Sequence, residues 1–273
     1  MVVGSGDDCA VLKFTDKLYQ LYTCDMIVEG VDFTAKDKPE LIGRKALGIS
    51  LSDIAACGGI PRYALVSMGL PKKFIGFAQR IAKGLFSLAK AYNVNIVGGD
   101  LSRANRLTID VSMLGVVENN NLVLRSGAKA GDIILVTGSL GRSILGKHLK
   151  FTPRLKESRF LVSNFKISSM IDISDGLTQD LAHILKASNV GAKIYEKSIP
   201  LSKDARNLED ALYGGEEFEL LFTLSQSQCR KLIFKKNSVF KPIGEIVDIR
   251  CGFKLIDKKN KGVTLSPKGW RHF

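Results

Sequence analysis

Seven aspartates stand in five short clusters that are flanked by glycine or serine and run from the N-terminus past the middle of the chain. Carboxylates that converge from separate parts of a chain repel one another unless cations hold them together. Such hard oxygen ligands suit Mg²⁺, which binds one or two carboxylates and takes its other ligands from water and substrate phosphates. The pattern therefore predicts a site for metal and phosphate. The seven residues are Asp7, Asp8, Asp25, Asp53, Asp100, Asp172 and Asp175.

A single aspartate in such a context usually caps a helix or closes a turn. The chain as a whole is basic, however, with a net charge of +13, so that five acidic clusters are not surface filler. Glycine beside them lets the backbone approach a phosphate and leaves amide groups free to point at it. The sequence has neither a Walker motif nor the protein-kinase motifs, so an ATP site here would be of a less common type.

The excess of basic residues raises the question of nucleic acid. Lysine and arginine are spread along the chain without interleaved aromatic residues, so we expect a solvated basic surface and no nucleic-acid partner. The five cysteines show no C-x-x-C spacing, which argues against a zinc site and a disulfide framework. No apolar run approaches the roughly 20 residues of a membrane span and no signal-peptide pattern is present, so we expect a cytoplasmic protein without a membrane partner.

Alternating hydrophobic patterns predict a mixed α/β protein in two halves, with the acidic clusters mostly in the first and several glycine-flanked acids at strand ends. The polar stretch 125–132 separates a domain at residues 1–124 from a domain at residues 125–273. In the first domain we expect strands at 18–24, 64–70, 94–97, 107–117 and 122–124 and helices at 39–56 and 74–92. In the second we expect strands at 133–137 and 217–224 and helices at 142–150, 176–188 and 226–236.

Six blocks of the sequence, taken in order, resemble the thiamine-monophosphate kinases, a family of the aminoimidazole ribonucleotide synthetase superfamily. The resemblance covers essentially the whole chain and extends to its ending, KGWRHF. It implies a two-domain ATP-binding fold and homodimers whose N-terminal halves pair into a shared β-barrel. The blocks are GSGDDCAV, LSDIAACGGIPRYALVSMGLP, IVGGDLSR, LRSGAKAGDIILVTGSLG, IDISDGLTQDLAHILKASNVGA and GGEEFELLFT.

The implied activity is ATP-dependent phosphorylation of thiamine monophosphate to thiamine diphosphate, with several Mg²⁺ ions and ATP as co-substrate. The acceptor phosphate is already an anion, so we expect metal-assisted transfer without a catalytic side chain. The resemblance assigns metal binding to Asp8, Thr23, Cys24, Asp25, Asp53, Asp100, Asp172 and Asp175. It assigns ATP binding to Gly99, Asp100, Arg125 and Ser174, and substrate binding to Asp32, Glu216 and Trp270.

Several positions depart from the family pattern. Cys24 replaces a hydroxyl residue, Asp32 replaces a histidine, and Glu217 replaces an aspartate. The stretch between Gly141 and Pro153 is shorter than usual, and Met1 lies just ahead of the G-D-D motif, where members carry a further helical segment. We expect either a start farther upstream or the loss of that segment. The site acids are intact, which favours an active enzyme.

Two other functions stay open at this point. Sister enzymes, such as selenophosphate synthetase, the hydrogenase maturation dehydratase or the purine-pathway synthetase, would share the nucleotide chemistry. The sequence lacks both a nucleophilic cysteine with a neighbouring lysine in an N-terminal glycine-rich loop and a terminal cysteine, which argues against the first two. A non-catalytic basic binding protein could also retain the fold, but unselected acids in a repulsive cluster should then be lost.

Overall fold

The computed structural model describes residues 1–233 and 239–270 and divides into two compact units. Unit 1 comprises Met1–Leu122 and Leu149–Leu155, and unit 2 comprises Val123–His148 and Lys156–Phe273. Within the described ranges, none of the helices combines the length and the apolar character needed to cross a membrane.

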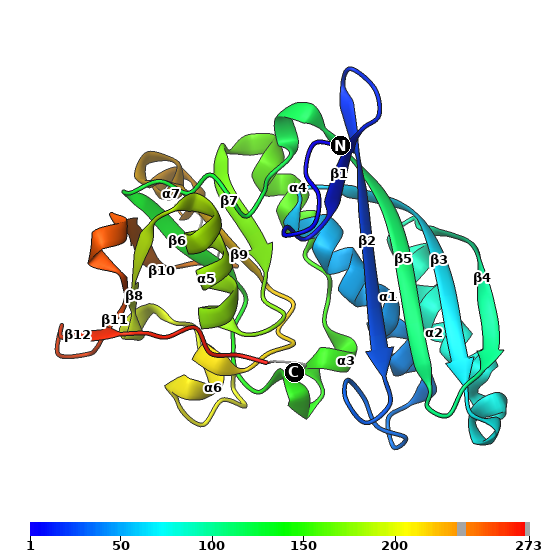
Figure 1. Cartoon of the computed structure of the whole chain (residues 1–273). Helices are drawn as coiled ribbons and strands as arrows, with labels where there is room; N and C mark the ends of the chain where they lie inside the picture. The colour runs from blue at the N-terminus through cyan, green and yellow to red at the C-terminus, as the bar shows by residue number, and fades with distance from the viewer. Residues whose placement is uncertain (234–238, 271–273) are drawn as a thin grey trace. The chain divides into compact units, whose positions relative to one another are not determined.

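Unit 1 is built on a five-stranded sheet with the strand order β1-β2-β5-β3-β4 (Figure 1). Neighbouring strands run antiparallel except β3 and β4, which are parallel. Strands β2 and β5 pair along their whole length and form the middle of the sheet on which the first site is built. The strands are β1 (Ala10–Lys13), β2 (Leu18–Val28), β3 (Ile60–Leu70), β4 (Asn95–Arg103) and β5 (Thr108–Glu118).

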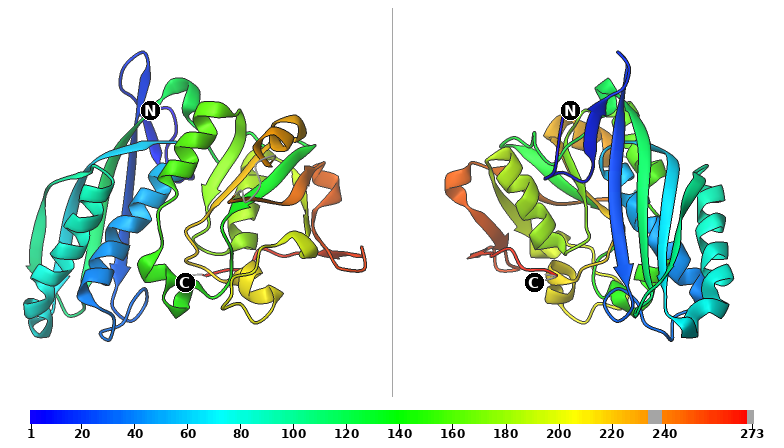
Figure 2. Two further views of the ribbon diagram at one scale, coloured as in Figure 1. Left: turned by 180° about the vertical axis from the view of Figure 1, so that it is seen from behind. Right: turned by 45° about the vertical axis from the view of Figure 1, so that its right-hand side comes forward.

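Helices α1 (Pro39–Ala56) and α2 (Ala78–Ala91) cover one face of this sheet, as the views in Figures 1 and 2 agree. Proline at the first turn of α1 fits because that position has no intrahelical acceptor for an amide. The two helices pack closely because glycines stand at the crossing. A Cβ atom on Gly43 would lie 2.0 Å from the Ile81 carbonyl oxygen, and one on Gly84 would lie 1.9 Å from that of Glu40.

The other face of the unit 1 sheet carries large apolar side chains that are exposed. Tyr22 and Met26 lie on β2, and Tyr63 and Leu65 lie on β3, where they alternate with buried residues of the helix-covered face. Exposed large apolar side chains gathered on one face of a sheet are typical of protein interfaces. Pairing of two N-terminal halves into a barrel would cover it, and that dimer stays a prediction.

Unit 2 is built on a seven-stranded sheet with the order β12-β11-β8-β10-β6-β9-β7, antiparallel except for β8 and β11. Helix α5 (Leu177–Ser188) buries Leu181 and Ile184 in a core with Ile134 and Leu221. Phe222 and Phe240 pack edge to face in a second group of buried side chains. The strands are β6 (Asp132–Thr137), β7 (Ile167–Asp172), β8 (Gly191–Tyr195), β9 (Leu220–Ser225), β10 (Phe240–Val247), β11 (Phe253–Ile256) and β12 (Gly262–Thr264).

The remaining helical elements among the described residues are short. Phe160 of α4 stacks on Phe240 with ring centroids 6.1 Å apart, so this helix adds to the aromatic group. Helix α7 contacts β6, β9 and β10. The helices are α3 (Lys147–Lys150), α4 (Leu155–Asn164), α6 (Leu208–Tyr213) and α7 (Gln226–Ile233). Single 3₁₀ turns cover Lys72–Phe77, Asn119–Asn121, Ser143–Leu145, Glu196–Ser198 and Ile249–Cys251.

The prediction that Asp25 and Asp100 stand at strand ends is wrong. Strand β2 continues past Asp25, and β4 runs through Gly98 and Gly99, so that Asp25 and Asp100 lie inside strands. The predicted strand at 94–97 stops before the two glycines. They instead permit close pairing, since a Cβ atom on Gly99 would lie 1.8 Å from the Val66 carbonyl oxygen.

Other differences fall in the second half of the chain. Residues 122–124 form no strand, and the helix predicted at 142–150 is broken at Gly146, which has φ of 123°. Helix α4 and strand β7 were not predicted. The polar Ser169 interrupts the apolar pattern of β7, which therefore gave no clear strand signal. In the structure its hydroxyl is buried and shares a 2.7 Å hydrogen bond with Thr223 on β9. Of the helix predicted at 226–236, residues 234–236 lie outside the described residues.

Candidate active site

Strand β2 and helix α1 bring three predicted metal ligands, Thr23, Asp25 and Asp53, together within unit 1. Ser50 Oγ donates a 2.8 Å hydrogen bond to Asp25 Oδ2, and the Thr23 hydroxyl donates to the Asp53 carboxylate. Thr23 and Asp25 share a face of β2, while Ser50 and Asp53 stand one turn apart on α1. The four side chains form a cluster of hard oxygen ligands between the strand and the helix.

The charge of Asp25 is costly in this cluster. Burial raises the pKa of the Asp25 carboxyl above its ordinary value, and the hydrogen bond from Ser50 opposes that shift. The Asp53 carboxyl group lies close enough to Asp25 to affect its pKa, and its effect also opposes the shift from burial. A bound cation would favour the charged form that burial disfavours.

Asp8 borders the same region from the turn ahead of β1 and is 8% exposed. The carboxylates of Asp7 and Asp8 and the Cys57 sulfur, which directly follows α1, offer ligand atoms within 4.8 Å of one another. The pKa of the neighbouring Cys9 thiol is raised well above its ordinary value. Burial is the largest cause, the hydrogen bond with Cys57 is the second, and the negative charges of Asp53 and Asp8 add to them. The carboxylates of Asp8 and Asp53 therefore both lie close enough to the buried Cys9 thiol to affect its pKa.

Two other predicted ligands of unit 1 lie across the sheet from this cluster. Cys24 alternates with Thr23 and Asp25, and its thiol donates to Asp110 Oδ2 at 3.3 Å on the open face. Asp100 pairs in register with Ser67, whose partner on the other side is Asp110, so that Asp100 belongs to the open face. Unit 1 therefore separates Cys24 and Asp100 from Asp25 and Asp53, although the prediction that they bind metal stays open.

Asp32, a predicted substrate ligand, lies in the turn after β2. Its Oδ2 accepts a 2.7 Å hydrogen bond from the Val28 amide, and its carbonyl oxygen accepts a 2.6 Å hydrogen bond from Lys45 Nζ. Lys45 is 1% exposed on α1, an unusual position for an ammonium group. Sequence reasoning missed Lys45, because one lysine among many gives no signal of burial.

The predicted residues of unit 2 gather where β7 ends and α5 begins. Asp172 is the last residue of β7, and Ser174 and Asp175 follow in the loop. The Glu216 amide donates to the Ser174 carbonyl at 2.6 Å, and the Trp270 amide donates to the Asp175 carbonyl at 3.0 Å. Two backbone hydrogen bonds thus tie both predicted substrate ligands to the loop that carries predicted ATP and metal ligands.

The C-terminal segment reaches this loop by specific contacts. Thr178 Oγ1 donates a 2.8 Å hydrogen bond to the Lys268 carbonyl, next to the first turn of α5. Gly269 allows the close approach, since a Cβ atom there would lie 2.4 Å from the Asp175 carbonyl oxygen. Trp270 is held beside Asp175 with its side chain about half exposed. A ligand therefore has access to the indole.

Two residues that sequence reasoning missed complete this group. Asp180 Oδ2 accepts hydrogen bonds from the amides of Asp175 at 3.1 Å and Gly176 at 2.9 Å. Burial, followed by the charges of Asp172 and Asp175, raises the pKa of Asp180 well above its ordinary value. His183 lies one turn later, and Asp175, Asp180 and His183 offer ligand atoms within 4.8 Å. Their spacing on the predicted helix after Ser174-Asp175 was the available signal.

Arg125, a predicted ATP ligand, lies near the same group. Burial lowers the pKa of the His183 imidazole, and the positive charge of Arg125 lowers it further, while Asp175 acts in the opposite direction. The Ser188 hydroxyl donates to the Arg125 carbonyl at 3.3 Å and so fixes the start of this segment to the end of α5. The Arg125 side chain thus belongs to the charged surroundings of Asp175.

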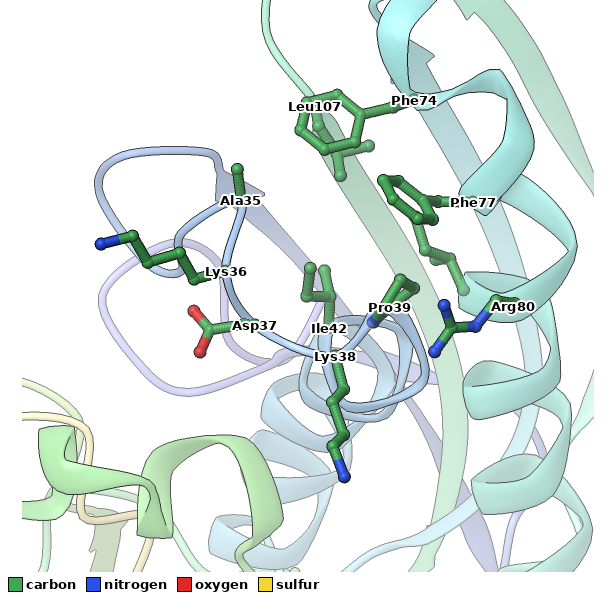
Figure 3. A pocket seen from close by; sticks show the side chains of 11 residues that line it. Ala35, Lys36, Asp37, Lys38, Pro39, Ile42, Phe74, Phe77, Arg80 and Leu107 are labelled. Atoms are coloured by element: carbon green, nitrogen blue, oxygen red, sulfur yellow. The ribbon is translucent and has the colours of Figure 1, made fainter.

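A separate pocket of unit 1 contains none of the predicted site residues (Figure 3). Its volume is about 250 Å³, below the roughly 300–1,000 Å³ typical of ligand sites. Phe74, Phe77 and Leu107 line it together with basic residues, of which Arg80 pairs with Glu40 at 2.8 Å. We therefore place the candidate active site at the acidic clusters.

Comparison with known proteins supports, across the chain, the family resemblance seen in the sequence. Residues 6–117 match the family described as AIR synthase related protein, N-terminal domain, and residues 129–251 match its C-terminal domain. The thiamine-monophosphate kinase of Buchnera aphidicola (strain APS) is 35% identical over 305 residues, covering 100% of this chain and 93% of the relative. That of Bacillus subtilis is 34% identical, covering 99% and 93%.

Solved structures agree with this result. AaThiL complexed with AMPPCP and TMP has a TM-score of 0.86 at 30% identity, covering 98% of this chain and 91% of that one. The hydrogenase maturation protein HypE in complex with ATP has a TM-score of 0.77 at 20% identity, which shows a common fold alone. By full-length identity to its curated relatives, the chain belongs to the thiamine-monophosphate kinase family, within the AIR synthase related proteins.

Proposed function

We propose that this chain phosphorylates thiamine monophosphate to thiamine diphosphate with ATP as the phosphoryl donor. The observation that carries the proposal is similarity over the full chain to thiamine-monophosphate kinases, at 31–37% identity in several relatives. The solved AaThiL complex holds AMPPCP and TMP, which are a nucleotide and a second ligand as the reaction requires. The alternative of a sister enzyme rests on likeness in fold alone.

The donor set fits Mg²⁺. Asp8, Asp25 and Asp53 offer carboxylate oxygens in unit 1, where burial raises the pKa of Asp25 and a cation would offset that cost. Asp172 and Asp175 offer the same ligand type in unit 2. Bound there, Mg²⁺ would neutralise the charge of the ATP phosphates and so reduce the repulsion from the acceptor phosphate.

The chain's own residues supply position rather than proton transfer. The acceptor is already anionic, so no general base is needed, and these residues contribute by orienting the two phosphates. We assign Ser174, Arg125, Gly99 and Asp100 to the nucleotide. Glu216 and Trp270, which are hydrogen-bonded to the Ser174–Asp175 loop, are assigned to thiamine monophosphate.

We also propose that the protein is a homodimer in which the open face of the unit 1 sheet is covered. Tyr22, Met26, Tyr63 and Leu65 are exposed there and would be buried by a second copy. Light scattering at micromolar concentration should return a dimer both with and without Mg²⁺. A monomer under both conditions would contradict this part of the proposal.

Incubation of the purified chain with Mg-ATP and thiamine monophosphate tests the reaction. Thiamine diphosphate and ADP should appear in equal amounts, and omission of Mg²⁺ or addition of EDTA should stop their formation. ATP binding without any thiamine diphosphate would instead favour a sister enzyme, and no ATP binding would favour a non-catalytic protein that kept the fold.

A further inference from the structure

A buried ion cluster in unit 2 joins two turns next to the proposed acceptor residues. Lys147 Nζ lies 2.8 Å from Glu217 Oε2 and 3.0 Å from Glu219 Oε1. The side chains of Glu217 and Glu219 are 1% and 3% exposed, whereas that of Lys147 is 31% exposed. Two carboxylates at this depth need a cation and hydrogen bonds, because unpaired buried charge is strongly unfavourable.

Glu217 and Lys147 also hold the Gly138–Gly141 turn. The Gly141 amide donates to Glu217 Oε1 at 2.6 Å, and Lys147 Nζ donates to the Ser139 carbonyl at 3.0 Å. Gly138 has φ of 59°, which favours glycine, and a Cβ atom there would lie 2.5 Å from Glu219 Oε1, so that the turn packs directly against this carboxylate. The turn therefore wraps around the ion cluster.

The same cluster fixes the segment that carries Glu216. Glu216 has φ of 59° and Phe218 has φ of 51°, which are left-handed conformations that non-glycine residues adopt only when their surroundings impose them. The amides of these residues donate to Ser174 and Ile173 on one side. The Glu217 side chain, which lies between them in sequence, is held by Lys147 and Gly141 on the other side.

We infer that Lys147 is a positioning residue, whose ammonium group holds Glu216 in the orientation that binds thiamine monophosphate. The inference rests on the proposed function and adds a residue that shapes the acceptor site. Lys147 itself touches neither substrate nor nucleotide. It acts through Glu217, which sets the backbone conformation on which the Glu216 side chain depends.

The test compares Lys147→Met with Lys193→Met in steady-state kinetics. Lys193 is the matched control, since its pair with Glu245 is exposed and 4.0 Å long. Lys147→Met should raise KM for thiamine monophosphate by about tenfold and change KM for ATP by less than about twofold. Lys147→Arg, which keeps the charge, should recover most of the affinity, and the control should match wild type.

A readout apart from activity separates this inference from the proposed function. In Lys147→Met, amide hydrogen exchange should accelerate in the segments 138–147 and 214–219 and stay unchanged elsewhere in unit 2. If wild type makes no thiamine diphosphate, the proposed function fails while the exchange result still stands. If Lys147→Met raises both KM values equally, or neither, the positioning role is rejected. Lys147→Gln, judged by the same criteria, replaces the methionine variant if the latter does not fold.

Discussion

The acidic cluster of unit 1 and the ion cluster of unit 2 hold their carboxylates by different means. Asp25 and Asp53 accept hydrogen bonds from the hydroxyl groups of Ser50 and Thr23. Glu217 and Glu219 instead share the ammonium group of Lys147. Hydroxyl groups orient a carboxylate without neutralising it, whereas an ammonium group does both.

The difference separates two roles for buried acids. A carboxylate whose pKa is raised by burial, as that of Asp25 is, gains free energy when a cation binds. A carboxylate that already has an internal cation gains much less free energy from a bound metal. Removal of that internal cation leaves the carboxylate as an unpaired buried charge. We therefore expect substitutions in the first cluster to affect turnover, and substitutions in the second to affect stability and the affinity for the acceptor.

The largest effect is expected for Asp53→Asn. Loss of this charge from the proposed metal ligands should lower kcat by about 100- to 1,000-fold, because electrostatic stabilisation of the transferred phosphoryl group is the main source of rate. Thermal unfolding of the metal-free variant should match or exceed that of wild type, since one repulsive charge is gone.

Asp16→Asn is the control for Asp53→Asn, because the Asp16 side chain is 97% exposed. Turnover of Asp53→Asn close to that of wild type at saturating Mg²⁺ would falsify the assignment.

Lys147→Met should have the largest effect on stability. Removal of the ammonium group leaves Glu217 and Glu219 facing each other, and we expect a loss of about 3 kcal/mol in the free energy of unfolding. Lys193→Met should cost less than about 1 kcal/mol, as exposed pairs do. Urea unfolding measures both, and equal losses would contradict the contrast between a lysine whose acidic partners are buried and one whose partner is exposed.

The pH dependence of stability should reveal the charge of Asp25. Because its pKa is higher in the folded than in the unfolded state, the folded state binds the proton more tightly. The stabilisation is present below the ordinary carboxyl pKa and is lost as pH rises through the raised value. In EDTA, wild type should therefore lose more Tm than Asp25→Asn between about pH 4 and pH 8. Parallel Tm curves would show that Asp25 carries no such cost.

The smallest effect is expected for Asp32→His. The Asp32 carboxylate accepts a hydrogen bond from the Val28 amide in a turn that Lys45 holds on α1. If this turn contacts the acceptor, KM for thiamine monophosphate should change by about threefold while KM for ATP stays constant. Unchanged kinetics with each substrate varied in turn would assign Asp32 to the turn alone.

The sequence predicted the acids but placed some of them in the wrong kind of element. The apolar runs 18–24 and 94–97 predict strands that end before Asp25 and Asp100. Both lie inside strands, and Gly98 and Gly99 serve close strand pairing instead. The helices at 39–56 and 176–188 were predicted nearly to the residue, since periodicity and terminal signals are local properties.

What the sequence determined by itself is the identity and order of the ligand types, the helices that carry local signals, and the family. Which acids share a cluster was decided only by tertiary structure. Cys24 and Asp25 are neighbours in sequence yet lie on opposite faces of β2, and Lys147 meets Glu217 and Glu219 across 70 or more residues. The reason is physical: strand register and burial set these contacts, and both depend on pairing between segments far apart in the chain.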